Sequence, residues 1–269
     1  MYISVVVPLF SEELNIDELY NRLKSSLDKI GKDYELIFID DGSRDGTFER
    51  LARLYKNDNR IHLIKLGRNF GQTTALAAGF DYAQGDIIIS MDGDLQHDPG
   101  EIPKFLEKIE EGYDVVSGWR KTRLDGLFTR RIPSFIANWL VSKISGIKIH
   151  DFGTTFKAYR KDVIKNIGLY GELHRFIPAL ASWSGATICE IPIRNVLRPS
   201  GKSHYGLFRT FKVMLDLLTV NFIIKYMSRP LHVFGMIGLF FFGIGTFVIA
   251  VLTICWAFFS LNLRGLLIH

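Results

Sequence analysis

Acidic residues gather in three short segments, and each segment directly follows an apolar run that is typical of a buried strand. The segments are Pro8-Leu-Phe-Ser-Glu-Glu13, Asp40-Asp41-Gly-Ser-Arg-Asp-Gly-Thr47 and Asp92-Gly-Asp-Leu-Gln-His-Asp-Pro99. Ligands of open α/β sheets bind outside the carboxyl ends of the strands. We therefore expect these three segments to form a binding site together.

The third segment has the composition of a metal site. In an extended chain, residues i and i+2 face the same way, so Asp92, Asp94 and Gln96 can converge on one point. Two carboxylates and an amide oxygen suit a hard divalent cation such as Mg²⁺ or Mn²⁺. A cation there would neutralise a pyrophosphate leaving group. Because Asp-Gly pairs taken singly are common turn formers, the prediction depends on the three segments occurring together.

Strands and helices are predicted to alternate through the first half of the chain. This alternation predicts an α/β fold with a mostly parallel central sheet covered on both faces. The helix over 14–30 carries an apolar stripe that begins at Leu14. The expected strands are 3–7, 35–39, 61–66, 86–91, 114–117, 155–159 and 186–193, and the expected helices are 14–30, 47–55, 73–83, 102–111, 133–144 and 176–183.

A long apolar segment follows the predicted α/β domain. No Asp, Glu, Lys or Arg occurs over 230–263, and a helix over 233–259 would reach about 40 Å, against a hydrocarbon core of about 30 Å. A buried core helix is the alternative, but such helices seldom run this long without a charge. We expect an α/β domain over 1–204, an amphipathic interfacial helix over 205–229, a transmembrane segment over 230–263 and a short tail over 264–269.

The charge distribution favours a membrane over nucleic acid. The 269 residues include 33 Lys+Arg and 28 Asp+Glu, which gives a net charge of +5, and the basic residues cluster beside the apolar segment and the polar motifs. Basic residues that precede the span outnumber those after it, so the positive-inside rule predicts that the N-terminal domain is cytoplasmic, at the inner membrane of a bacterial-type cell.

The N-terminus has no basic region typical of a signal peptide. Cys189 and Cys255 are the only cysteines, so neither a disulfide framework nor a zinc site is expected.

The order of these motifs resembles glycosyltransferase family 2, and within it the polyprenyl-phosphate glycosyltransferases. The resemblance runs from about Ile3 through the apolar segment and implies a GT-A fold. The motifs that carry it are the three acidic segments together with Gly67-Arg-Asn-Phe-Gly71, Gly118-Trp-Arg120, Arg130-Arg-Ile-Pro-Ser134, Asp151-Phe-Gly-Thr-Thr-Phe-Lys-Ala-Tyr-Arg160, Leu173-His-Arg-Phe-Ile-Pro178 and Arg198-Pro-Ser-Gly-Lys-Ser-His-Tyr-Gly206. Members often carry a second membrane span, whereas this sequence shows one.

The resemblance implies roles for individual residues. The nucleoside of a nucleotide-sugar donor would contact Pro8, Phe10 and Glu12, with either Asp40 or Asp41. Asp92 would contact the sugar of the donor. Asp92, Asp94 and Gln96 would hold Mg²⁺ or Mn²⁺. The phosphate of the lipid acceptor would meet Arg120, Arg131 and Ser134, and a closing loop would supply Arg198, Lys202 and Ser203. The groups closest to the reaction would be Asp94, Asp151 and Arg120.

These roles imply an inverting transfer of a sugar to a polyprenyl phosphate at the cytoplasmic face. On the resemblance alone, we also expect a homo-oligomer in the membrane. We favour UDP-glucose as donor, with GDP-mannose, as in a dolichol-phosphate mannose synthase, as the alternative. A non-catalytic GT-A binding module is a second alternative. A processive polysaccharide synthase is disfavoured because the sequence has no Gln-x-x-Arg-Trp motif, and a dehydrogenase because no Gly-x-Gly-x-x-Gly follows the first strand.

Overall fold

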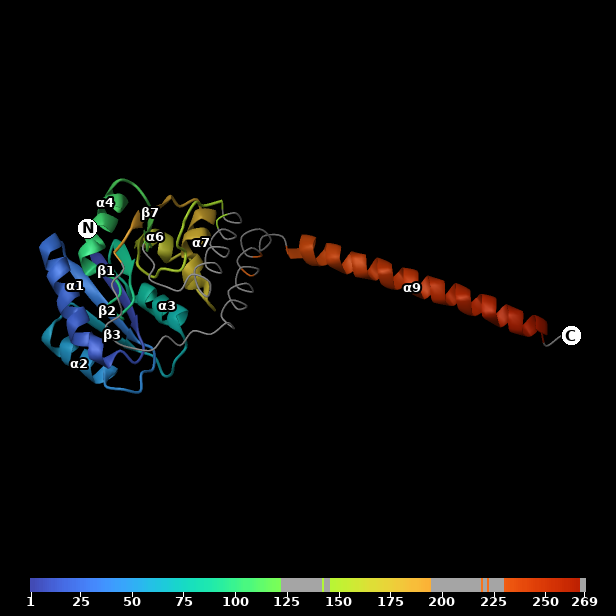
Figure 1. The fold of residues 1–269 in the computed structure, drawn as a ribbon, viewed down its shortest axis with the longest axis horizontal. Coiled ribbons are helices and arrows are strands. Elements are labelled where there is room, and N and C mark those ends of the chain that lie inside the picture. The colour runs from blue at the N-terminus through green and yellow to red at the C-terminus, as the bar shows by residue number, and fades with distance from the viewer. Residues whose placement is uncertain (122–141, 143–145, 195–218, 220–221, 223–229, 267–269) are drawn as a thin grey trace. The chain divides into compact units, whose positions relative to one another are not determined.

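The computed structural model describes residues 1–121, 142, 146–194, 219, 222 and 230–266. The chain divides into two compact units, Met1–Val220 and Asn221–His269. The first unit contains the sheet and the helices that cover it (Figure 1). The helix predicted over 133–144 and the amphipathic segment over 205–229 lie almost entirely outside the described residues.

The first unit is built on a seven-stranded sheet with the order β3-β2-β1-β4-β6-β5-β7. β1 pairs in parallel with β2 and β4, β2 with β3, and β5 with β7, whereas β6 is antiparallel to both β4 and β5. The sheet is therefore mostly parallel, as the alternating pattern predicts. The strands are β1 (Ile3–Leu9), β2 (Tyr34–Asp40), β3 (Ile61–Lys65), β4 (Ile87–Ser90), β5 (Val115–Trp119), β6 (Lys157–Arg160) and β7 (Ile188–Pro192).

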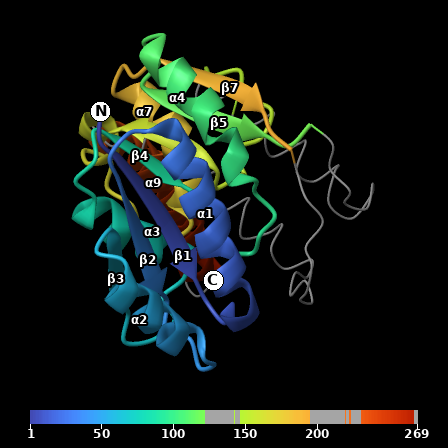
Figure 2. The same ribbon diagram turned by 90° about the vertical axis from the view of Figure 1, so that its left-hand side faces the viewer.

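Helices cover both faces of this sheet. Apolar side chains of α1 (Ile16–Ile30), α2 (Thr47–Asn57) and α4 (Ile102–Glu110) pack on one face, which is the face turned to the viewer in Figure 2. α3 (Gln72–Tyr82), α6 (Lys161–Ile164) and α7 (Ile177–Trp183) pack on the other. Short 3₁₀ turns lead into three of the helices: η1 (Glu13–Asn15), η2 (Pro99–Glu101) and η4 (Leu173–Phe176).

Most element boundaries differ from the sequence predictions by one or two residues, and two of these differences concern residues used in the predictions. α1 begins at Ile16, and Leu14 lies in the preceding η1 turn with 78 % of its surface exposed, so its place on the buried stripe was wrong. β6 begins at Lys157, two residues after the predicted start, because Thr154 and Thr155 belong to the loop that contacts the candidate site.

The second unit contains one long helix, α9 (Pro230–Leu266). Its segment Phe234–Phe258 has a mean hydropathy of 2.5, and no part of its most apolar window is buried within the protein. By length and composition this segment can cross a bilayer.

Candidate active site

The two adjacent aspartates that follow β2 have different partners. Asp41 accepts hydrogen bonds from the backbone N–H groups of Phe70 (2.8 Å) and Gly71 (2.9 Å), and so holds the loop before α3. Asp40 Oδ1 accepts from Ser43 N at 3.0 Å, while its Oδ2 is buried without a hydrogen-bond partner. A buried carboxylate oxygen with no donor is costly. Asp40 is therefore the one of the pair that is suited to accept a hydrogen bond from a ligand.

A cavity of about 420 Å³ lies beside this loop. Gly42 and Ser43 form one wall, Phe10 contributes an aromatic ring that is 45 % exposed, and Lys65 and Arg68 supply positive charge. Gly42 has a φ of +70°, and a Cβ there would lie 2.5 Å from the Arg68 carbonyl carbon, so the loops approach too closely for another residue. The cavity has the size and lining of a site for a base and its adjoining phosphate.

Two other residues predicted near the nucleoside have structural partners. Pro8 lies within β1, paired with Ile39. The backbone N–H of Glu12 donates to Thr47 Oγ1 at 3.0 Å, and its carboxylate accepts from Asn15 Nδ2 at 2.5 Å. The first contact joins the segment after β1 to the start of α2, and the second joins Glu12 to the η1 turn.

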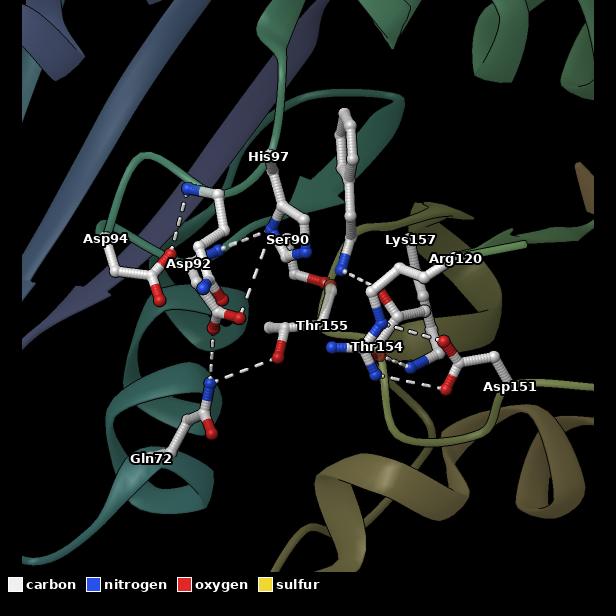
Figure 3. Close-up of polar contacts among 12 residues, drawn as sticks. Gln72, Ser90, Asp92, Asp94, His97, Arg120, Asp151, Thr154, Thr155 and Lys157 are labelled. Carbon is white, nitrogen blue, oxygen red and sulfur yellow. Dashed lines mark hydrogen bonds and ion pairs between the residues drawn. The ribbon is translucent and has the colours of Figure 1, made fainter. Parts of the chain in front are cut away.

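The segment after β4 presents its polar side chains on one side. Asp92, Asp94 and Gln96 are partly exposed, and they alternate with buried residues (Met91, Gly93, Leu95 and His97). Asp94 Oδ1 accepts from Gln96 N at 3.1 Å, and Asp92 Oδ1 accepts from Gln72 Nε2 at 2.6 Å (Figure 3). The structure thus brings the three predicted metal ligands to the same side of one segment.

Electrostatics at this segment follow from burial. Burial raises the pKa of the Asp92 carboxyl, although 31 % of this side chain is exposed; a hydrogen bond from Thr155 and the charge of Arg120 oppose the shift. Burial lowers the pKa of His97 to about 4, so its ring is neutral at pH 7. The neutral ring accepts the Asp92 N–H at Nδ1, over 3.3 Å.

Arg120 and Asp151 form a bidentate ion pair on the other side of Thr154 and Thr155 (Figure 3). Arg120 Nε lies 2.8 Å from Asp151 Oδ2, and its Nη2 lies 3.1 Å from Oδ1. Asp151 is 1 % exposed and Arg120 is 22 % exposed, so the cation is the member of the pair that reaches solvent. Sequence motifs 31 positions apart therefore meet in the fold.

Three further polar residues complete this region, and sequence analysis assigned no role to them. Gln72, the first residue of α3, donates to both Asp92 and Thr155 Oγ1. Glu190 and Lys157 contact the loop that carries Asp151. The Gly67–Gly71 motif directly precedes Gln72, and Lys157 lies within the quoted motif 151–160, but neither motif indicated a role for these residues; no motif lies near Glu190. Five predicted acceptor residues (Arg131, Ser134, Arg198, Lys202 and Ser203) lie outside the described residues.

Comparison with known proteins settles the family. The profile for glycosyl transferase family 2 matches residues 4–168. The chain belongs to glycosyltransferase family 2. It is 44 % identical over 255 residues to dodecaprenyl-phosphate galacturonate synthase of Rhizobium johnstonii, covering 93 % of this chain and 74 % of that protein. It is 38 % identical over 238 residues to undecaprenyl-phosphate 4-deoxy-4-formamido-L-arabinose transferase of Shewanella sediminis, covering 88 % and 70 %.

Solved structures agree with the fold. Glucosyl-3-phosphoglycerate synthase of Mycobacterium tuberculosis, in complex with Mn²⁺, UDP-glucose and phosphoglyceric acid, superposes with a TM-score of 0.64 at 16 % identity, covering 83 % of this chain and 79 % of that one. The GT-A prediction is confirmed. Its similarity to these two transferases places this family 2 chain among the polyprenyl-phosphate glycosyltransferases.

Proposed function

We propose that this glycosyltransferase moves a hexuronate from a nucleotide donor to an undecaprenyl-type phosphate, by an inverting reaction at the cytoplasmic face of the membrane. Residues 1–204 are the catalytic domain in this proposal. The observation that carries it is the arrangement of Asp92, Asp94 and Gln96 on one side of a segment, next to the Arg120–Asp151 pair. The first three residues offer oxygen ligands to a divalent cation that would bind the donor phosphates, and Arg120 offers a positive charge to the acceptor phosphate.

The donor nucleobase contacts Asp40 in this proposal. The Oδ2 atom of Asp40 is buried and lacks a donor, and Ser43, whose N–H donates to the other oxygen, lines the cavity together with Phe10. Uracil and guanine each present a ring N–H that a carboxylate accepts, whereas the rings of adenine and cytosine present none at the matching position. A uridine or guanosine diphosphate sugar is therefore the proposed donor, with Asp41 holding the neighbouring loop.

For the sugar, support comes from the relatives. The 44 % identical protein is named for galacturonate and the 38 % identical protein for a formamido-arabinose, and neither name contains glucose. We therefore place a uronate donor ahead of the UDP-glucose that the sequence alone favoured, and GDP-mannose behind both.

The residues after β4 fit a divalent cation by their chemistry. Carboxylate and amide oxygens are the ligands that Mg²⁺ and Mn²⁺ prefer, and Asp92 and Asp94 are partly open to solvent. Within the described residues, no group of three or more His, Cys, Asp or Glu is placed to hold a metal. Two carboxylates suffice where donor phosphates fill the remaining positions. When bound, the cation supplies charge neutralisation for the leaving diphosphate.

The protein's own groups would position the acceptor. A phosphate monoester has a second pKa of about 6 and is mostly dianionic at neutral pH, so its oxygen attacks the anomeric carbon without a general base. The bond from that carbon to the donor phosphate breaks, and the nucleoside diphosphate leaves with the electron pair. Arg120 would bind the acceptor phosphate, and Asp151 would orient Arg120. Arg131, Ser134, Arg198, Lys202 and Ser203 remain proposed contacts of the same phosphate.

A panel of radiolabelled nucleotide sugars with undecaprenyl phosphate in detergent tests this function. We expect one uronate donor to label the lipid phase and a chelator to abolish the transfer. Asp94→Asn should lose metal-dependent turnover, whereas Asp98→Asn, in the same segment, should keep it because Asp98 only caps a 3₁₀ turn. Near-normal activity of Asp94→Asn would remove the metal assignment, and transfer from glucose alone would remove the uronate.

A further inference from the structure

The loop from His150 to Thr154 carries Asp151, and its backbone is held by two charged side chains. Asp151 is 1 % exposed and uses both carboxylate oxygens to hold Arg120. Asp151, Phe152 and Thr154 of this loop are buried, and buried peptide N–H and C=O groups need partners. The structure supplies a carboxylate for the N–H groups at its start and an ammonium for the C=O groups at its end.

Glu190 on β7 provides the carboxylate. It accepts from His150 N (3.0 Å to Oε1), from Asp151 N (2.9 Å) and from His150 Nδ1 (2.8 Å). The Glu190 side chain is only 8 % exposed. Three donors on one nearly buried carboxylate fix the direction in which the chain enters Asp151.

Lys157 on β6 provides the ammonium. Its side chain is 1 % exposed, and Nζ donates to the carbonyl oxygens of Phe152, at 3.3 Å, and of Thr154. Lysine is almost never fully buried without a specific partner. The two carbonyls that it binds belong to the same loop that Glu190 holds from the other end.

Strand register places these two residues on one face of the sheet. Lys157 is opposite Ser117 on β5, and Ser117 is opposite Glu190 on β7, so the three side chains form a row across neighbouring strands. Directly after this row, Trp119 stacks on His150 with ring centroids 4.5 Å apart and planes inclined by 18°. The residue before Arg120 therefore packs on the residue before Asp151.

We propose that Glu190 and Lys157 are positioning residues, which hold the 150–154 loop so that Asp151 aims Arg120 at the acceptor phosphate. Neither touches the substrate in this proposal. The inference rests on the proposed roles of Arg120 and Asp151. Loss of either charge leaves buried backbone groups without partners, and the loop then departs from the geometry that aligns the pair.

Hydrogen exchange of the full chain in detergent tests whether Glu190 and Lys157 hold the 150–154 loop, and it needs no assay of activity. We expect Glu190→Gln and Lys157→Met to speed exchange in peptides covering 146–156 by about tenfold or more, since each lost contact weakens local protection. Glu111→Gln, which breaks only an exposed ion pair with Lys108 at the end of α4, is the matched control and should leave these peptides unchanged. Unchanged exchange in both site variants would overturn the proposal.

Kinetic measurements distinguish a loss of Arg120 positioning from a general loss of folded structure. In Glu190→Gln we expect kcat to fall about tenfold or more while the affinity for the nucleoside diphosphate stays within twofold, because the nucleotide cavity lies beside β2 and β3. Lys157→Arg, which keeps the charge, should recover part of the kcat lost in Lys157→Met. Equal loss of nucleotide affinity and kcat would overturn the proposal. If the wild-type enzyme transferred no sugar, the proposed function would fail, while the exchange result would still judge the loop.

Discussion

At the scale of single residues, neighbouring side chains of one type differ because of the partners that the fold gives them. Asp40 and Asp41 are adjacent and both buried, yet Asp41 has two backbone donors and Asp40 keeps one oxygen without any. Burial without a partner is costly enough that such an oxygen is expected to meet a ligand donor. Because of this difference we assign Asp40 to the ligand and Asp41 to the loop before α3.

We predict opposite effects of replacing these two aspartates. Asp40→Asn should weaken binding of the nucleoside diphosphate by about tenfold to a hundredfold, because an amide presents a donor where the base presents one. Asp41→Asn should mainly lower the melting temperature, since it removes an acceptor from the loop before α3. Calorimetric titration with the nucleotide and thermal melts in detergent measure both. Equal loss of nucleotide affinity in the two variants would contradict the distinction.

At the scale of elements, close approach between loops shapes the nucleotide cavity. The backbone after β2 meets the backbone after β3 at Gly42, where φ is +70° and a Cβ would lie 2.5 Å from the Arg68 carbonyl carbon. Gly31 after α1 has a similar φ of +67° but nothing within 4 Å. The two glycines have the same left-handed backbone conformation, which glycine adopts readily, and they differ in the space around them.

This pair offers a controlled prediction. Gly42→Ala should reduce nucleotide affinity at least tenfold, because the loops that line the cavity must separate. Gly31→Ala should cost only about 1–2 kcal/mol of stability from its backbone conformation and leave nucleotide affinity unchanged. Titration and melting of both variants decide the matter, and retained affinity in Gly42→Ala would show that the cavity is not the nucleotide site.

A second element-scale feature joins α1 to the start of β3 through Asp58. Hydrogen bonds from the Arg60 side chain hold the pKa of Asp58 well below its usual range, and Tyr20 donates to the same carboxylate at 2.8 Å. A depressed folded-state pKa contributes stability above the unfolded pKa of about 4, and this contribution is lost as pH falls further.

We therefore expect the melting-temperature difference between wild type and Asp58→Asn to be largest near pH 7 and to shrink below about pH 4. Asp81→Asn, at an exposed position on α3, should show little difference at either pH. Thermal melts in detergent at several pH values measure this effect. A difference that stays constant with pH would contradict an ionic origin.

How far the sequence predicts the structure depends on the range of the interactions. Local sequence patterns predicted each strand of the described sheet to within two residues at either end, because such patterns depend on local geometry. Asp92, Asp94 and Gln96 are all partly exposed, as alternation predicts, but Leu95 between them has a φ of +63°, so the segment is not extended throughout. The antiparallel direction of β6 depends on long-range pairing and was not predicted. Glu190 was missed because its partners lie 39 and 40 residues away.

Lys157 was missed for a different reason. Composition places lysine at the surface, and only the tertiary fold supplies the carbonyls that allow this one to be buried. Burial also lowers the pKa of its ammonium to about 7, against the usual value above 10. Likewise, sequence alone left the choice between Asp40 and Asp41 open. The two backbone donors that bind Asp41, at Phe70 and Gly71, lie 29 and 30 residues further along the chain.

At the scale of the whole molecule, a soluble-type catalytic fold is combined with a helix suited to a bilayer. The acceptor lipid stays in the membrane, so the enzyme must work at its surface. The segment Phe234–Phe258 in α9 offers an apolar anchor, and the basic residues that precede it place the catalytic domain in the cytoplasm in our proposal.

Cysteine labelling tests this orientation in intact cells. In a chain with Cys189 and Cys255 replaced by serine, Lys56→Cys on the exposed side of α2 should react with an impermeant maleimide only after the inner membrane is opened. Arg264→Cys, beyond the apolar segment, should react before it is opened. The reverse pattern would place the catalytic domain outside the cytoplasm.

In our proposal, the acidic residues at the carboxyl ends of the strands, among them Asp40, Asp92 and Asp94, serve the transfer of a sugar to a lipid phosphate. The most direct measurement gives the purified enzyme a nucleotide sugar, a divalent cation, and either undecaprenyl phosphate or undecaprenol, and weighs the lipid products by mass spectrometry. We predict that undecaprenyl phosphate gains one sugar joined through its phosphate, with one nucleoside diphosphate released, and that undecaprenol gains none. Equal transfer to undecaprenol, or release of free sugar without any lipid product, would contradict the account.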